Sequence, residues 1–205
     1  MKTTYRTLPR ASIACLVTLL LLPLFAVSSA VSQPFDQTLT LQGISFQVSC
    51  TNEGSLNDLQ IIPNGLEIDN RMISRKEIDG SVTGAEVADL NKDGSPELYI
   101  YINSAGSGSY GSLIAYSANN KKSLSTIYLP PLEEDSEHAR GYMGHDRFFV
   151  TETTLIRQFP IYRDGDSNAN PTGGTRQLDY ILAAGEANWQ LKLAQVSNLA
   201  YDTEI

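Results

Sequence analysis

Apolar and polar residues alternate along much of the chain after residue 35, and this alternation predicts β-strands. Leu98, Ile100 and Ile102 alternate with Tyr99 and Tyr101. Because successive side chains of a strand point to opposite faces, this segment should present one aliphatic face and one aromatic face. The same pattern predicts further strands at residues 39–41, 44–48, 113–116, 125–129, 148–150, 154–159, 161–162, 177–183 and 189–193.

Turn sequences rich in Gly, Asn and Asp separate these segments at short, regular intervals. Many short strands at such spacing favour an antiparallel β-sandwich or a flattened barrel. Residues 133–140 have the best helical signature, with acids in the first turn and Gly141 as a stop. We therefore predict a mainly β, single-domain fold with one or two short helices and a core at about residues 35–195.

The first thirty residues have the pattern of a secretory signal peptide. Lys2, Arg6 and Arg10 precede a largely apolar run over residues 11–27, and small residues lead up to Ala30. Cleavage after Ala30 would leave residues 31–205 as a periplasmic or secreted domain, with no membrane attachment. An uncleaved anchor is the alternative, although the run is shorter than the ~20 apolar residues that a span needs.

Charge and cysteine content change once this segment is removed. The chain has 15 Lys and Arg against 23 Asp and Glu; without the three basic residues above, 12 oppose 23 and the net charge falls from −8 to −11. Nucleic-acid binding is not expected, because it rests on basic residues that neutralise phosphates. Cys50 would remain as the sole cysteine, expected to be a buried small hydrophobe, with an intermolecular disulfide as the alternative.

Residues 89–97 read D-x-N-x-D-G-x-x-E, which places oxygen ligands at Asp89, Asn91, Asp93 and Glu97. Oxygen ligands two positions apart, with Gly at the sharp turn, are typical of loops that wrap calcium. The twelve-residue EF-hand does not fit, because its last position falls on an isoleucine. A turn whose Asx side chains bind their own backbone is the alternative. Calcium is thus the one possible cofactor, and a calcium-dependent binding or adhesion module is an alternative function.

The apparent enzymatic motifs of the sequence lack the structural context or the spacing that their chemistry requires. Residues 106–111 match G-x-G-x-x-G, but a strand-like segment follows where a dinucleotide site needs a helix. Neither Ser107 nor Ser109 fits G-x-S-x-G, and the adjacency of His145 and Asp146 does not make a catalytic triad. The chain is therefore not expected to be an enzyme.

The segment at residues 104–111 carries three glycines, three serines and one tyrosine, with no charge. The glycines allow a narrow tip, from which the hydroxyls of Ser107, Ser109 and Tyr110 can project. Such a loop could enter a cleft and donate hydrogen bonds to carboxylates, while the tyrosine adds a rigid contact area. A flexible hairpin tip is the alternative.

At this loop the chain resembles the periplasmic inhibitors of invertebrate-type (i-type) lysozyme. The resemblance extends over about residues 82–193, in blocks at residues 89–99, 104–111, 141–146, 159–166 and 171–178. In that family a loop of pattern S-G-x-Y plugs the active-site cleft of the lysozyme. Ser107, Gly108, Ser109 and Tyr110 fit this pattern, and Ser107 and Tyr110 take the contact role.

The resemblance implies an exported, bacterial, β-rich homodimer whose partner is a lysozyme, with the i-type as the class in the family's name. Lysozymes cleave the cell wall with a pair of carboxyl groups in a cleft, and many are basic. A net charge of −11 would steer the chain toward such a partner. The residues alone leave the lysozyme class open.

Overall fold

The computed structural model describes residues 1, 33–133 and 135–200, so the predicted signal peptide lies outside the described residues. The described part is mainly β, as predicted. Its strands are β1 (Phe35–Leu41), β2 (Ile44–Cys50), β3 (Leu56–Asn64), β4 (Ile73–Asp79), β5 (Ser81–Ala88), β6 (Glu97–Asn103), β7 (Gly111–Asn119), β8 (Ser123–Tyr128), β9 (Arg147–Val150), β10 (Leu155–Pro160), β11 (Thr175–Ala184) and β12 (Trp189–Leu199).

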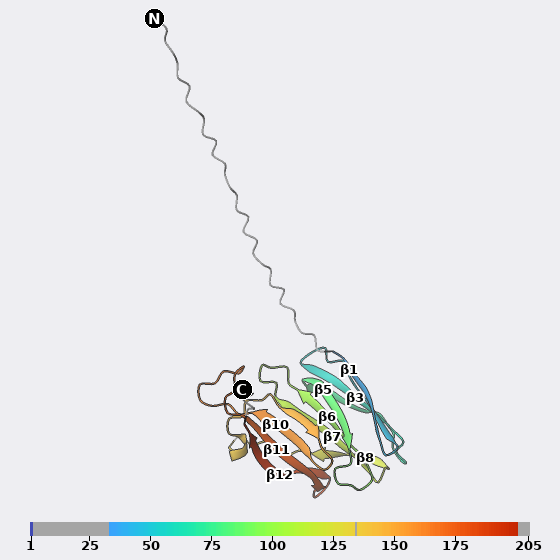
Figure 1. Ribbon diagram of the computed structural model, residues 1–205. Helices are drawn as coiled ribbons and strands as arrows, with labels where there is room; N and C mark the ends of the chain where they lie inside the picture. The colour runs from blue at the N-terminus through green and yellow to red at the C-terminus, as the bar shows by residue number, and fades with distance from the viewer. Residues whose placement is uncertain (2–32, 134, 201–205) are drawn as a thin grey trace. The chain divides into compact units, whose positions relative to one another are not determined.

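Strands β1–β4 form an antiparallel four-stranded sheet in sequence order. Alternate side chains of β2 and β3 are buried, among them Phe46, Val48, Leu59 and Ile61. These side chains pack in one core cluster with residues of β5, β6 and β7 from the second sheet. The small sheet therefore covers one face of the β5–β7 segment (Figure 1).

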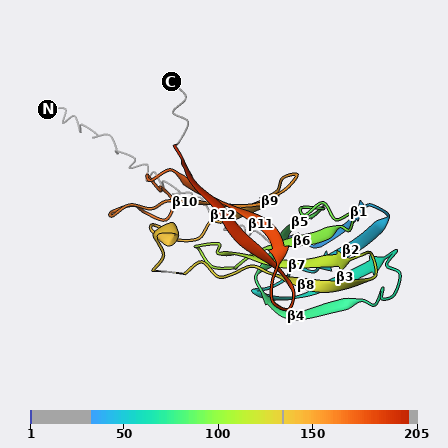
Figure 2. The ribbon, with the colours of Figure 1, turned by 90° about the horizontal axis from the view of Figure 1, so that it is seen from below.

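The second sheet has eight strands in the order β5-β6-β7-β8-β12-β11-β10-β9. Its neighbours are antiparallel except β8 and β12, which pair in parallel over two residue pairs. The prediction was a purely antiparallel fold. The exception arises because β12, the last strand in sequence, lies beside β8 and runs in the same direction. The two edges of the sheet also meet, since Val150 N–H donates to Glu86 Oε2 at 3.1 Å. The result is a nearly closed, barrel-like sheet, with β9–β12 on the other side of β5–β8 from the small sheet (Figure 2).

Strand β6 has the predicted aliphatic and aromatic faces, and both are buried. Leu98, Ile100 and Ile102 belong to the core shared with the small sheet. Tyr99 and Tyr101 belong to a second core, inside the barrel-like sheet. Because each fully buried large side chain contributes about 1.5–3 kcal/mol, β6 anchors both cores.

Two local predictions need correction. Among the described residues of the helix predicted at 133–140, only Glu137–Ala139 are helical, as a 3₁₀ turn in which Ser136 Oγ accepts from Ala139 N–H at 3.3 Å. Two prolines before this segment and Gly141 after it leave little room for a longer helix. Ile161 and Tyr162 do not form a strand either, because their N–H groups donate to the turn carbonyls of Gly174 and Gly141.

Candidate functional site

The tip loop (residues 104–111) joins β6 to β7 and is closed by its own hydrogen bonds. At its base, Ser104 N–H donates to the Tyr110 carbonyl at 2.9 Å, and Tyr110 N–H donates to Ser104 Oγ at 3.0 Å. At its tip, Ser109 N–H donates to the Gly106 carbonyl at 3.0 Å. Ser109 has a φ of +42°, so this turn includes a residue in the left-handed region. The tip is therefore a hydrogen-bonded turn.

Two other segments hold the tip by its backbone. His145 N–H donates to the Gly108 carbonyl at 2.7 Å, and Asn168 Nδ2 donates to the Ser107 carbonyl at 2.8 Å. The two supports are joined, since His145 Nε2 lies 3.2 Å from Asn168 Oδ1. Because these bonds engage main-chain carbonyls, they fix the tip without engaging the Ser107 side chain, which is exposed.

The supporting loop (residues 141–146) approaches the tip closely at one glycine. A Cβ on Gly144 would stand 2.0 Å from the carbonyl oxygen of Gly108, and Gly144 has a φ of +89°. Only glycine fits this contact, for both steric and conformational reasons.

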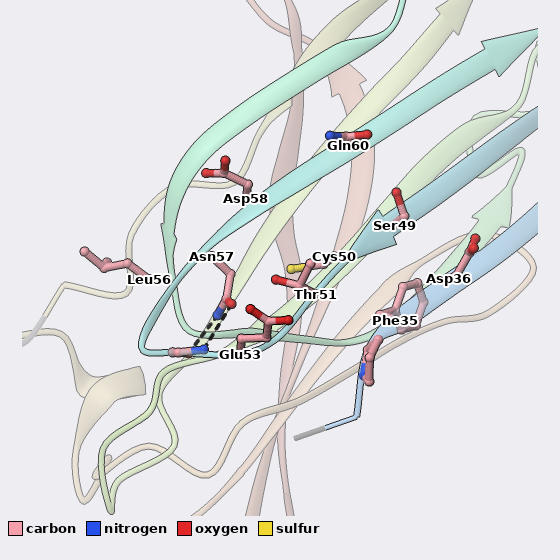
Figure 3. Close-up of a pocket in the computed structure, with 12 residues that line it drawn as sticks. Phe35, Asp36, Ser49, Cys50, Thr51, Glu53, Leu56, Asn57, Asp58 and Gln60 are labelled. Atoms are coloured by element: carbon pink, nitrogen blue, oxygen red, sulfur yellow. Dashed lines mark hydrogen bonds between the residues drawn. The ribbon is translucent and has the colours of Figure 1, made fainter. Parts of the chain in front are cut away.

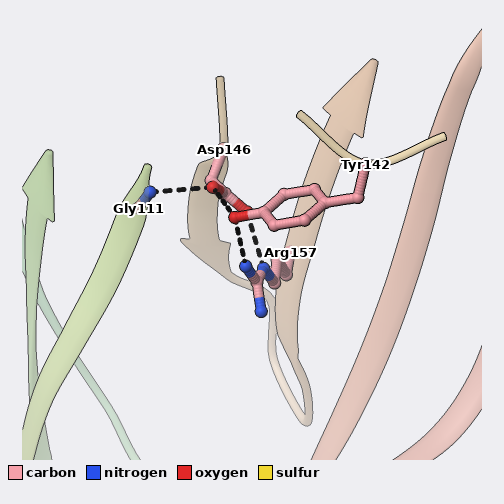
Figure 4. A network of polar contacts seen from close by, with 4 residues as sticks. All are labelled: Gly111, Tyr142, Asp146 and Arg157. Atoms are coloured by element: carbon pink, nitrogen blue, oxygen red, sulfur yellow. Dashed lines mark hydrogen bonds and ion pairs between the residues drawn. The ribbon is translucent and has the colours of Figure 1, made fainter. Parts of the chain in front are cut away.

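A buried polar network lies where the tip loop enters β7 (Figure 4). Asp146 Oδ2 accepts from Gly111 N–H at 2.7 Å and from the Tyr142 hydroxyl at 2.6 Å. Asp146 Oδ1 accepts from Arg157 Nε at 2.6 Å, and a second guanidinium nitrogen donates to the Tyr142 oxygen at 2.8 Å. The Arg157 and Asp146 side chains are 7% and 0% exposed. Strand β10, through Arg157, thus helps to position the end of the tip loop.

The charges of this network are compensated within it. Burial lowers the pKa of Arg157, but the attraction of Asp146 and their hydrogen bond outweigh it and raise the pKa above its usual value. The guanidinium also lies over the rings of Tyr142, Phe148 and Phe159, at 5.1 to 5.8 Å from their centroids. Burial, with the bond to Asp146, raises the pKa of Tyr142, so its hydroxyl remains a donor at neutral pH.

Tyr110 packs against Tyr142 of this network, and about half of its surface is exposed to solvent. It is 51% exposed, and its ring meets that of Tyr142 edge-on, with 5.7 Å between the centroids. A cavity of about 390 Å³ lies beside it, lined by Tyr110, Leu132, Ala139 and Tyr142. The sequence-predicted residues 107–110 are therefore together at one exposed tip, with Ser107 and Tyr110 more accessible than Gly108 and Ser109.

Sequence reasoning missed the residues that hold this tip. His145 and Asp146 drew attention as a possible catalytic pair, but the His145 ring contacts Asn168 and the Asp146 carboxylate bonds Arg157. Both residues of the pair support the tip loop. The block at residues 141–146 was a usable signal for this role, whereas no spacing rule connects it to Arg157.

The acidic loop (residues 89–97) has features of both structures expected from its sequence, a group of oxygen ligands and an Asx turn. Carboxylate oxygens of Asp89, Asp93 and Glu97 lie within 4.8 Å of one another. Asp89 also accepts from the N–H groups of Asp93 and Gly94, each at 3.0 Å, as an Asx turn would. Asn91, the fourth predicted ligand, also contacts this group: its Oδ1 accepts from Asp93 N–H and its Nδ2 donates to Asp93 Oδ2, each at 3.1 Å.

The acidic loop also contains a buried carboxyl group, that of Glu97, which is 0% exposed and, unlike Asp146, forms no ion pair among the described residues. Burial raises the pKa of Glu97 to about 8; the Leu90 N–H bond opposes this shift, and the negative charges of Asp89 and Asp93 add to it. An ordinary surface turn does not hold a carboxyl group in such an environment.

A large open hollow of about 720 Å³ lies at one end of the small sheet (Figure 3). Asp36, Glu53 and Asp58 line it, and its described lining includes no histidine or lysine. Asn57 Nδ2 donates to the carbonyls of Gly54 and Gly80, which ties loops together. Cys50 also borders the hollow but is 4% exposed, in agreement with the expected buried thiol. The described residues that line this hollow therefore form no recognisable catalytic or metal-binding group.

Comparison with known proteins supports the sequence resemblance. Residues 66–138 match the model of a family described as the periplasmic lysozyme inhibitor of I-type lysozyme. The match overlaps the predicted resemblance over residues 82–138, which include the acidic loop and the tip loop, whereas the predicted blocks at residues 141–146, 159–166 and 171–178 lie outside it. No curated protein compared with the chain matches it significantly. Across the residues that the structure describes, no helix is long and apolar enough to cross a membrane.

Proposed function

We propose that this chain is an exported inhibitor of i-type lysozyme that inserts its tip loop into the active-site cleft of the enzyme. The observation that carries the proposal is the contrast within the loop. Its backbone is fixed by His145, Asn168 and Asp146, while Ser107 and Tyr110 are exposed at the tip. The family match, which spans this loop, supports the same function.

The chemistry of the tip suits a lysozyme cleft. A glycosidase cleft holds two carboxyl groups that flank the scissile bond. The hydroxyls of Ser107 and Tyr110 can donate hydrogen bonds to those groups, and bonds to a charged acceptor are the stronger ones. Because the loop is already ordered, little further conformational entropy is lost on insertion. The occupied cleft then excludes the polysaccharide.

The charge of the exported chain supports encounter with such a partner. With the predicted signal peptide removed, 12 basic residues oppose 23 acids. A protein of this charge is attracted to a basic enzyme, chiefly through a faster association rate. Many lysozymes are basic, so the charge favours this class of partner without selecting among its members.

Lysis of a bacterial cell-wall suspension tests the proposal directly. Lysozymes of i-, c- and g-type are assayed with and without the purified protein, and near-stoichiometric loss of i-type activity alone is expected. The double variant Ser107→Ala/Tyr110→Ala should abolish the inhibition. Its matched control is Ser112→Ala/Tyr128→Ala, which removes an exposed serine and an exposed tyrosine outside the loop.

Two results would contradict the proposal. Full activity of every lysozyme class in the presence of the protein would exclude inhibition. Full inhibition by the double loop variant would exclude insertion of the tip loop as the mechanism. The homodimer that the resemblance implies also stays a prediction, which sedimentation velocity of the purified protein tests.

A further inference from the structure

We propose that the carboxylates of Asp89, Asp93 and Glu97 bind one calcium ion in the acidic loop. This site lies apart from the tip-loop contacts and does not depend on the proposed inhibition of lysozyme. The three residues come from one short segment: Asp89 and Asp93 lie in the connection between β5 and β6, and Glu97 is the first residue of β6.

The spacing of the carboxylates suits a single ion. Calcium binds oxygen ligands at 2.3–2.6 Å, so two ligands of one ion stand at most about 5 Å apart. The oxygens that Asp89, Asp93 and Glu97 offer all lie within 4.8 Å of one another. The group contains only oxygen donors, which suits calcium better than zinc or copper.

The state of Glu97 points to a ligand. Its side chain is completely buried; Oε2 accepts from Leu90 N–H at 2.9 Å, but Oε1 has no hydrogen-bond partner among the described residues. The hydroxyls of Tyr99 and Ser117 are also buried without a partner in normal hydrogen-bond geometry; Tyr99 interacts with the Glu97 carboxyl group but does not satisfy Oε1. Buried polar atoms are nearly always satisfied, so an unpartnered carboxylate oxygen beside two more carboxylates fits a metal ligand.

The group also lacks a counter-charge of its own. The ion pairs of the described residues are Arg71 with Asp69, Lys76 with Asp58, and Arg157 with Asp146, so none includes a member of this group. Three carboxylates this close repel one another strongly when all are ionised. A divalent cation would convert that repulsion into attraction.

The loop would reach the ion with little rearrangement. Asp89 and Asp93 are fixed by the N–H groups of residues 93–95, yet each ionised carboxylate has about four acceptor positions, and these bonds leave some of them open. Gln42 Nε2, from the β1–β2 turn, donates to Asp89 Oδ2 at 2.6 Å. Because this bond joins the small sheet to the loop, calcium should stabilise the junction between the two sheets.

Calorimetry and thermal unfolding of the purified protein test the site. After treatment with a chelator, titration with CaCl₂ should give saturable heat with one ion per chain. Calcium at about a hundredfold excess over its Kd should raise Tm by several degrees. Asp93→Asn keeps an acceptor for the Ser95 N–H but loses the charge, and it should weaken calcium binding at least about tenfold.

The matched control is Asp79→Asn, which makes the same change at an exposed aspartate in another Asp-Gly turn and should bind calcium like the unmodified protein. Glu97→Gln should remove calcium binding too, but Asp93 is exposed and its variant does not depend on refilling a buried position. The absence of both binding heat and Tm shift in the unmodified protein would overturn the proposal. Unchanged binding by Asp93→Asn would also overturn it, because the ion would then be bound elsewhere.

Discussion

The backbone N–H of Gly111 donates to the carboxylate of Asp146 across 35 positions of sequence, at 2.7 Å. Gly111 is the first residue of β7, and Asp146 ends the supporting loop just before β9. The exposed tip of residues 107–110 is thereby connected to a buried ion pair in the barrel-like sheet. The stability of that pair and the geometry of the tip should therefore change together in variants of Asp146.

Asp146→Ala should destabilise the fold strongly. It leaves Arg157 buried without its counter-charge, and the loss of one partner of a buried ion pair costs about 3–5 kcal/mol. Urea denaturation measures the free energy of unfolding. Asp69→Ala is the control, since it removes the partner of an exposed arginine and should change stability little. Equal stability of the two variants would contradict a structural role for the buried pair.

Gly144→Ala should impair inhibition because its methyl group would collide with the Gly108 carbonyl and displace the tip. The control is Gly43→Ala, because Gly43 also has a positive φ but no atom stands within 4 Å of its would-be Cβ. Both variants pay the conformational cost of about 1 kcal/mol, and Gly144→Ala adds the collision. The ratio of their inhibition constants measures the displacement; a ratio of one would show that the contact does not position the tip.

The strands predicted correctly are those whose surroundings repeat every two residues. Strand β6 lies between two cores, so its aliphatic and aromatic faces could be recognised from sequence. Strands β3, β4 and β5 were not predicted. β5 is interrupted by a bulge between Val82 and Gly84, and β4 is largely exposed at a sheet edge, so neither shows a clean alternation. β3 alternates in burial, but Asn57 and Pro63 occupy buried positions and Leu56 and Ile62 exposed ones, so its sequence does not show that alternation.

In the candidate site, too, features of one short segment could be predicted from the sequence, whereas contacts between distant segments could not. The composition of residues 104–111 indicated a narrow hydroxyl-bearing loop, and the spacing of Asp89, Asp93 and Glu97 indicated a group of oxygen ligands. The support that Asp146 and Arg157 give the tip could not be predicted, because Arg157 reaches Asp146 only through the pairing of β9 with β10. Likewise, the complete burial of Glu97 depends on how the sheets pack.

Asn168→Ala tests the second support of the tip. It removes the bond to the Ser107 carbonyl and the contact with His145, both on the surface, so the fold should remain stable. A hydrogen bond contributes about 0.5–1.5 kcal/mol, which corresponds to an inhibition constant up to about tenfold weaker. Asn170→Ala is the neighbouring control, whose side chain bonds only within its own turn. Inhibition by Asn168→Ala equal to that of the control would remove this support from the mechanism.

Tyr110→Phe separates the hydroxyl of the tip from its ring. The phenylalanine keeps the edge-on packing against Tyr142 but cannot donate a hydrogen bond to a carboxylate in the cleft. Hydrogen bonds to charged groups contribute about 1.5–3 kcal/mol, so the inhibition constant should rise by about tenfold or more. Tyr128→Phe, at an exposed tyrosine of β8, should leave it unchanged. If Tyr110→Phe inhibits normally while Tyr110→Ala does not, the ring's contact area holds the tip in the cleft, and the carboxylates there are blocked without the tyrosine hydroxyl.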